Sequence, residues 1–246
     1  MDKQAVYEHI KQQIIEEKLL PGHKFVEREL CATYCLSRTP IREILWKLTS
    51  DSFLEQEPNR GFIVRKLGLE QIFEVFQARE AVEGMVARLA CSKGDESFRY
   101  TLREIMEKLN KLDAEADPAQ GSALGRQLHG AIVEAARNGI MVGIYEKLKN
   151  LSIFTSNITR KSPAIEKVSK EAHLILINAL LEQDEEKSER LMREHPRDTC
   201  RQIVEQSYPN MLGSASNNRS KKLGLEYLWP ESETLNLPAG LTPAGK

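Results

Sequence analysis

The chain has 246 residues, of which 35 are Lys or Arg and 36 are Asp or Glu, so its formal charge is −1. This balance excludes a polybasic protein that binds nucleic acid over its whole surface, and any such binding must come from a local patch. The sequence contains no run of 18 apolar residues and begins with a charged segment. We therefore expect neither a membrane span nor a secretory signal, and the four scattered cysteines favour a cytoplasmic protein.

The first 50 residues predict three helices. Apolar residues recur at helical spacing from Val6 to Ile15, and this helix must end before Pro21-Gly22. A second helix is predicted from about Glu27 to Tyr34, and a third begins after Ser37, which is a good N-cap residue. The connection between the second and third helices is only a few residues long, which is typical of a helix-turn-helix.

A β-hairpin is predicted directly after these helices. Two β-prone runs, 53–57 and 62–65, flank the turn sequence Pro58-Asn59-Arg60-Gly61. A helix-turn-helix followed by a hairpin indicates a winged helix, which we assign to residues 1–66. Cys31 and Cys35 are expected to be small buried residues of this domain, with a redox switch as the alternative.

The rest of the chain predicts an antiparallel helical bundle over residues 67–208, so the fold class is mainly α. Apolar stripes and breaks at Gly, Pro and Asn residues place helices at about 69–92, 96–115, 119–137, 140–158, 163–182 and 184–207. The connections are short, so neighbouring helices should pack antiparallel. From residue 209 the composition shifts to Asn, Ser, Gly and Pro, which predicts a flexible tail over 209–246.

Basic residues gather on the expected reading side of the winged helix, although the first 66 residues hold 11 basic and 10 acidic side chains. These residues are Arg28, Arg38, Arg42, Arg60, Arg65 and Lys66. A recognition helix presents its N-terminal residues to base edges, and Arg suits guanine or phosphate, whereas Ser37 and Thr39 suit phosphate or a thymine methyl group. The small, basic turn Asn59-Arg60-Gly61 suits a groove or the DNA backbone. The alternative for each Arg is a solvated surface charge.

The motifs of the first domain resemble the winged helix of GntR-type bacterial transcription regulators. They are Pro21-Gly22, Glu27-Arg28-Glu29-Leu30, Ser37-Arg38-Thr39-Pro40-Ile41-Arg42-Glu43 and Pro58-Asn59-Arg60-Gly61, in family order and spacing. The resemblance implies that Arg28, Arg38, Arg42 and Gly61 contact an operator.

Three histidines are the informative residues of the second domain. His129, His173 and His195 fall on three different predicted helices beside apolar faces, so their imidazoles are able to converge on a divalent metal with open positions for water or a ligand. The alternative for each one is a partly buried histidine satisfied by hydrogen bonds.

The helical domain resembles the metal-containing form of the FCD ligand-binding domain of the FadR subfamily. The matching segments are 77–83, Leu128-His129, Ala136-Arg137-Asn138, Ala172-His173 and Glu194-His195. The resemblance implies that the three histidines bind Zn, Ni or Mn, together with an Asp one turn before the first histidine. Gly125 stands at that position. The site is then completed by water or effector, gains a carboxylate from elsewhere, or is weakened or lost; we expect three-His binding to be retained.

Arg79 is the candidate effector-binding residue, since it matches a family Arg that meets an effector carboxylate. Its alternative is an i, i+4 ion pair with Glu83 on a solvated face. Together these observations predict a homodimeric, ligand-responsive transcription regulator, a repressor, that binds a palindromic DNA operator and a small organic-acid or sugar-acid effector. The alternatives are a regulator that senses the metal itself, or a three-His metalloenzyme fused to a DNA-binding domain.

Overall fold

The computed structural model describes residues 2–58, 61–160 and 162–207 of the chain, with the backbone alone at 156–160 and at 207. The predicted DNA-contacting residues Asn59 and Arg60 and the predicted tail 209–246 lie outside the described residues. Within them, the fold is mainly helical, with a two-stranded antiparallel sheet, as the sequence predicted.

The N-terminal part forms a winged helix. Its helices are α1 (Lys3–Ile15), α2 (Glu27–Tyr34) and α3 (Arg38–Ser50), and its wing is the hairpin of β1 (Leu54–Glu57) and β2 (Gly61–Val64). Ser37 is the N-cap residue of α3, and Gly61 opens β2 with a φ of 77°, a conformation that favours glycine. The apolar faces of α1 and α3 and the inner face of the hairpin enclose one core.

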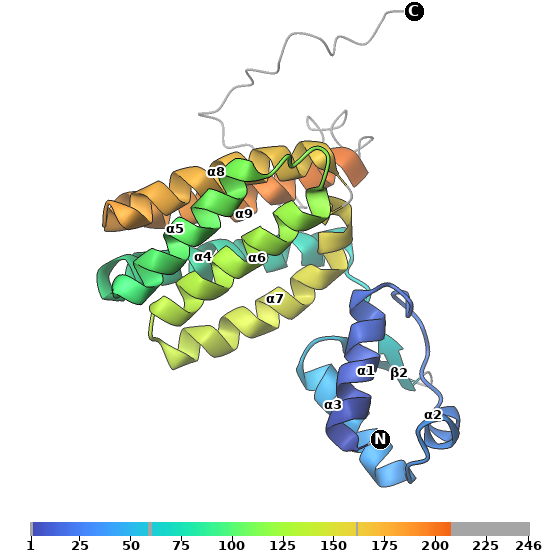
Figure 1. Ribbon diagram of the computed structural model, residues 1–246. Coiled ribbons are helices and arrows are strands. Elements are labelled where there is room, and N and C mark those ends of the chain that lie inside the picture. The colour runs from blue at the N-terminus through green and yellow to red at the C-terminus, as the bar shows by residue number, and fades with distance from the viewer. Residues whose placement is uncertain (1, 59–60, 161, 208–246) are drawn as a thin grey trace, which may run out of the picture.

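The second part is a bundle of six helices (Figure 1). These are α4 (Leu69–Lys93), α5 (Glu96–Lys111), α6 (Pro118–Ala135), α7 (Gly139–Arg160), α8 (Pro163–Leu181) and α9 (Glu185–Ser207). The side chains of Asp95, Asp117 and Ser162 each accept a hydrogen bond from a first-turn amide, which starts α5, α6 and α8. A continuous apolar core joins the helices, and α9 packs along α4.

Two local expectations were wrong. Helix α5 ends at Lys111 rather than near 115, because Asp113 accepts hydrogen bonds from the amides of Glu115 and Ala116 and so forms a turn in place of helix. Cys31 is partly buried against the winged-helix core, but Cys35 is exposed, since it ends α2 in the left-handed conformation with a φ of 54°.

Helix α7 connects the bundle to the winged helix. Ile153 and Phe154 pack against the winged-helix core. The side-chain amide of Asn150 donates a hydrogen bond to the carbonyl oxygen of Asp51 at 2.9 Å, and the hydroxyl of Tyr7 donates to the carboxylate of Asp51 at 2.5 Å. The two parts of the chain therefore meet through packed side chains and hydrogen bonds, as well as through the linker before α4.

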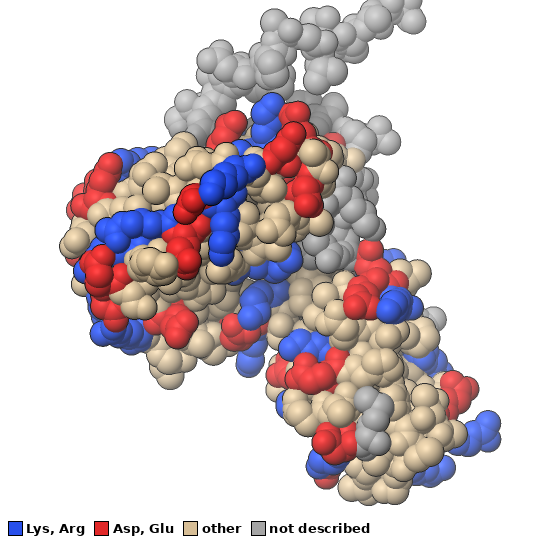
Figure 2. Space-filling view, viewed as in Figure 1, with Lys and Arg blue, Asp and Glu red and all other residues tan. Residues whose placement is uncertain are grey.

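The surface carries charges of both signs. On the face shown in Figure 2, acidic and basic side chains are interspersed over both the bundle and the winged helix. None of the helices in the described part of the chain is long and apolar enough to cross a membrane.

The bundle core predicts a sharp contrast between two positions of α5. Leu102 is fully buried, whereas Tyr100 is 61% exposed. We expect Leu102→Ala to lower the free energy of unfolding by about 2–5 kcal/mol, because it removes buried methyl groups and leaves a cavity. Tyr100→Ala should change it by less than about 0.5 kcal/mol. Urea unfolding followed by circular dichroism measures both, and equal effects of the two variants would contradict the assigned core.

Candidate functional site

The structure brings His129, His173 and His195 together from α6, α8 and α9. Their nearest ring nitrogens all lie within 4.8 Å of one another, and the Nε2 atoms of His129 and His173 are 3.3 Å apart. His129 and His173 are 7% and 4% exposed, and the ring of His195 lies 4.6 Å from that of His173 between centroids. Three different helices thus place three imidazoles around one point.

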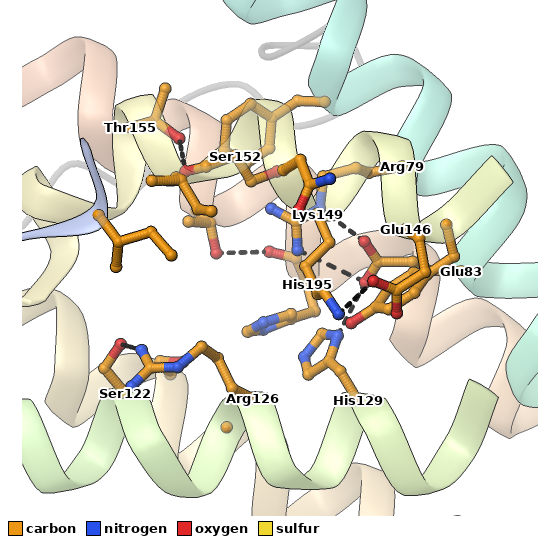
Figure 3. Close-up of a pocket in the computed structure, with 18 of the residues that line it drawn as sticks. Arg79, Glu83, Ser122, Arg126, His129, Glu146, Lys149, Ser152, Thr155 and His195 are labelled. Atoms are coloured by element: carbon orange, nitrogen blue, oxygen red, sulfur yellow. Dashed lines mark hydrogen bonds and ion pairs between the residues drawn. The ribbon is translucent and has the colours of Figure 1, made fainter. Parts of the chain in front are cut away.

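A buried chain of hydrogen bonds orients His129. Glu83 of α4 is 1% exposed, and its Oε2 atom lies 2.8 Å from Nδ1 of His129, while Nε of Arg79 donates to its Oε1 atom at 2.5 Å. An ionised carboxylate only accepts hydrogen bonds, so Nδ1 of His129 carries a proton and its Nε2 atom faces that of His173. Figure 3 shows Glu83 between Arg79 and the histidines.

Burial and the neighbouring charges determine the protonation states. Burial alone would raise the pKa of Glu83, but the charge of Arg79 and the hydrogen bond with His129 outweigh it and hold that pKa well below its ordinary value. Desolvation lowers the pKa of His173 to about 3 and lowers that of His195 well below its ordinary value. Both rings are therefore neutral at physiological pH, which is the form that ligates metals.

Gly125 explains how His173 reaches this point. A Cβ atom at residue 125 would lie 2.7 Å from Cε1 of His173, closer than carbon atoms approach without a shift. The ring of His173 therefore occupies the space into which the side chain of an Asp at 125 would extend. Among the described residues, no carboxylate joins the three histidines as a possible ligand, and Glu83 contacts the nitrogen of His129 that faces away from the other two histidines.

The donor set fits a divalent metal. Zinc binds imidazole nitrogens at about 2.0–2.1 Å in tetrahedral sites, which separates two ligating nitrogens by about 3.3 Å. The two Nε2 atoms of His129 and His173 already have this separation. A bound divalent ion would supply positive charge and open coordination positions at this point.

The histidines face a cavity of about 590 Å³. Arg79 and Glu83 line it, and Ser122 and Arg126 extend toward it from α6 beside His129 (Figure 3). Its wall also includes residues of the winged helix: Tyr7, Lys11, Ile15 and Asp51. The cavity therefore spans the junction of the two parts of the chain.

Arg79 forms the ion pair with Glu83 that the sequence offered as an alternative, but the pair is buried rather than solvated. The side chains of Arg79 and Glu83 are 15% and 2% exposed, and both line the cavity. The i, i+4 spacing in the sequence indicated the Arg79–Glu83 pair. Its burial, however, depends on the packing of α6 and α9 against α4. Sequence reasoning did not predict the contact of Glu83 with His129, and it assigned no role to Glu166, a second buried carboxyl group in the cavity wall.

The predicted DNA-contacting side chains of α2 and α3 are all exposed. They are Arg28, Ser37, Arg38, Thr39 and Arg42. Nε of Arg42 donates to Glu27 at 2.7 Å, but the Arg42 side chain is still 64% exposed. Arg65 differs from the expectation, because it is 22% exposed and donates to the carbonyl oxygens of Ser52 and Leu54, which ties it to the wing.

Comparison with known proteins assigns both parts of the chain. Residues 2–64 match the model of the gntR family of bacterial regulatory proteins, and residues 74–198 match the FCD domain. The chain belongs to the GntR family and carries an FCD domain. It is a transcriptional regulator.

Individual relatives of this GntR regulator agree. The Nta operon transcriptional regulator of Aminobacter aminovorans is 26% identical over 75% of this chain and 86% of its own length. The transcriptional repressor RspR of Escherichia coli K12 is 24% identical over 78% of this chain and 84% of its own length. The structure of E. coli McbR/YncC has the same fold, with a TM-score of 0.68, 24% identity, and coverage of 83% of this chain and 98% of that one.

Two glycines of α6 provide a test of the packing around His173. We expect Gly125→Ala to lower the free energy of unfolding by about 1–3 kcal/mol, because its Cβ atom would press on the His173 ring. Gly130→Ala is the matched control, since a Cβ atom there meets nothing within 4 Å and should stabilise the helix by about 0.5–1 kcal/mol. Urea unfolding of both variants measures the difference, and a stabilised Gly125→Ala variant would contradict the described position of His173.

Proposed function

We propose that this GntR regulator binds a divalent metal through His129, His173 and His195 and a small carboxylate effector in the adjoining cavity. The convergence of three buried or half-buried imidazoles on one wall of that cavity carries the proposal. A carboxylate oxygen is a suitable ligand for the open positions of a metal held by three neutral histidines. Arg79, already paired with Glu83, lines the same wall.

The position of the cavity supports a coupling between effector binding and DNA binding. Tyr7 and Lys11 belong to the first helix of the winged helix, and both line the cavity. A bound effector would therefore contact both parts of the chain, and a ligand shifts a conformational equilibrium only through such differential contacts. Helix α7 is a second connection, because Asn150 and Phe154 contact the winged helix.

We propose further that the regulator acts as a homodimeric repressor on a palindromic operator. Two winged helices related by a two-fold axis present two recognition helices to successive major grooves. The exposed N-terminal residues of α3, together with Arg28 of α2, supply the DNA contacts of each subunit. The name of the relative RspR, a repressor, agrees with this direction of regulation.

The DNA-binding surface is tested by removing two of its charges. We expect Arg38→Ala with Arg42→Ala to weaken binding at least tenfold, because each Arg contact contributes about 1–3 kcal/mol. The probe is a duplex that the wild-type protein selects from a random-sequence pool, and fluorescence anisotropy measures its affinity. The control, Arg103→Ala with Lys108→Ala, removes two exposed charges from α5. Equal affinity of all three proteins would exclude α3 as the reading helix.

The metal site is tested by metal analysis of the purified protein. We expect the wild-type protein to bind about one zinc, nickel or manganese ion per chain, and His173→Ala to lose at least tenfold in affinity because one of three ligands is gone. His23→Ala, at an exposed position of the winged helix, is the control. A wild-type protein without metal, or a His173→Ala variant with unchanged metal content, would refute the site.

A titration separates an effector-responsive regulator from a metal sensor. Operator affinity is measured against zinc, nickel and manganese, with and without small organic acids. Under our proposal the acids change the operator affinity of the metal-loaded protein. A response to metal alone, with none to any acid, would favour metal sensing instead.

A further inference from the structure

Two glycines of α6 lie against two side chains of α8. A Cβ atom at Gly125 would meet His173, and a Cβ atom at Gly121 would lie 3.0 Å from Oε2 of Glu166. Gly121 and Gly125 are one helical turn apart, and Glu166 and His173 are two turns apart, so all four positions follow the contact between the two helices. The space left by Gly121 is thus occupied by a carboxyl group, just as the space left by Gly125 is occupied by an imidazole.

Among the described residues, the carboxyl group of Glu166 has no hydrogen-bond or ion-pair partner. Its side chain is 4% exposed and lines the cavity, and it makes no hydrogen bond or ion pair with the residues that the structure describes. No fully buried side-chain oxygen of the described residues lacks a partner, so the oxygens of Glu166 are reached from the cavity. Burial raises the pKa of Glu166 to about 7, and the charge of Arg126 opposes this rise without cancelling it.

Glu83 provides the contrast within the same cavity. Glu83 is as buried as Glu166, but Arg79 and His129 occupy its oxygens and hold its pKa well below the ordinary value. A buried polar group without a partner costs free energy unless a ligand or water satisfies it. Of the two buried carboxyl groups, Glu166 is therefore the one that remains available to a ligand.

Two structural roles for Glu166 do not apply. It does not replace the missing Asp ligand, because it is not among the groups that lie within 4.8 Å of one another around the metal position. Nor does it cap α8, because the side chain of Ser162 accepts the first-turn hydrogen bond from Ile165. Its carboxyl group instead lies in the cavity wall, seven residues before His173 on the same helix.

We propose that Glu166 is the second recognition group of the cavity, and that it selects an acid with a hydroxyl or amino group at the end opposite its carboxylate. The inference rests on the proposed function, in which the effector carboxylate binds near the histidines. The Glu166 carboxyl group and the His173 ring lie against Gly121 and Gly125, which are about one helical turn or 5.4 Å apart, so the effector is an acid of several carbon atoms. A hydroxyl or ammonium group donates the hydrogen bond that a carboxylate accepts. At pH 8, where Glu166 is ionised, a second carboxylate would place like charges together, which is unfavourable.

Matched acids test this selection on the full-length protein with its metal. Isothermal calorimetry compares butyrate, pentanoate and hexanoate with their ω-hydroxy and ω-amino derivatives and with the dicarboxylates of the same lengths. We expect one ω-hydroxy or ω-amino acid to bind at least tenfold more tightly than both the unsubstituted acid and the dicarboxylate of that length.

Three variants assign the preference to Glu166. Glu166→Gln keeps the shape of the side chain but not its charge, so it should reduce the preference for the ω-amino acid at least tenfold. Glu166→Leu removes both hydrogen-bonding oxygens and should abolish the preference for either substituent. Glu171→Gln is the control, because Glu171 is an exposed carboxylate on the same helix, and it should bind like the wild-type protein.

The outcomes distinguish this inference from the proposed function. Equal binding of substituted and unsubstituted acids, tighter binding of a dicarboxylate, or a preference that survives in Glu166→Gln and Glu166→Leu would overturn the role of Glu166. If unsubstituted acids still bind, and that binding is lost in His195→Ala, the proposed function stands alone. If the wild-type protein binds none of the acids, both fail.

Discussion

The site depends on the hydrogen bonds that the buried carboxylate of Glu83 forms with Arg79 and His129. A charge that is 1% exposed is tolerated in a helical bundle only when partners compensate for its lost hydration, and here Arg79 and His129 do so through hydrogen bonds to its two oxygens. The same contacts connect α4 to α6 and determine which nitrogen of His129 carries its proton. Because Nδ1 of His129 is hydrogen-bonded to Glu83, its Nε2 atom is the nitrogen that faces the other histidines.

The close contact between α6 and α8 determines the rest of the donor set. Gly125 removes the carboxylate that the FCD resemblance places at this position, and it also makes room for the His173 ring. The absence of an Asp ligand at residue 125 and the close packing of the His173 ring therefore have the same cause, which is Gly125. Arg79 and Glu83 neutralise each other, and the neutral imidazoles of His173 and His195 add no charge. A divalent ion bound there would keep its full positive charge, which suits an anionic effector.

The junction between the two parts gives the cavity its regulatory potential. Most of the wall is built by the bundle, but Tyr7, Lys11 and Asp51 of the winged helix complete it. The hydroxyl of Tyr7 donates a hydrogen bond to the carboxylate of Asp51, and the carbonyl oxygen of Asp51 accepts a hydrogen bond from Asn150 of α7. A ligand in this space would have direct contact with the part of the chain that reads DNA, so the proposed coupling needs no long series of intermediate residues.

The sequence by itself determined the features that depend on local spacing. The limits of α2, the N-cap position of Ser37, the hairpin and the breaks before α6 and α8 follow from apolar periodicity and capping residues, whereas the end of α5 was missed because the Asp113 turn competes with helix. Tertiary structure alone decided that the Arg79–Glu83 pair is buried, that a side chain at residue 125 would collide with His173, and that Glu166 is buried in a cavity wall. The physical reason is that helical periodicity specifies which face of each helix is apolar, while burial, close approach and the pairing of charges depend on which helices pack against that face.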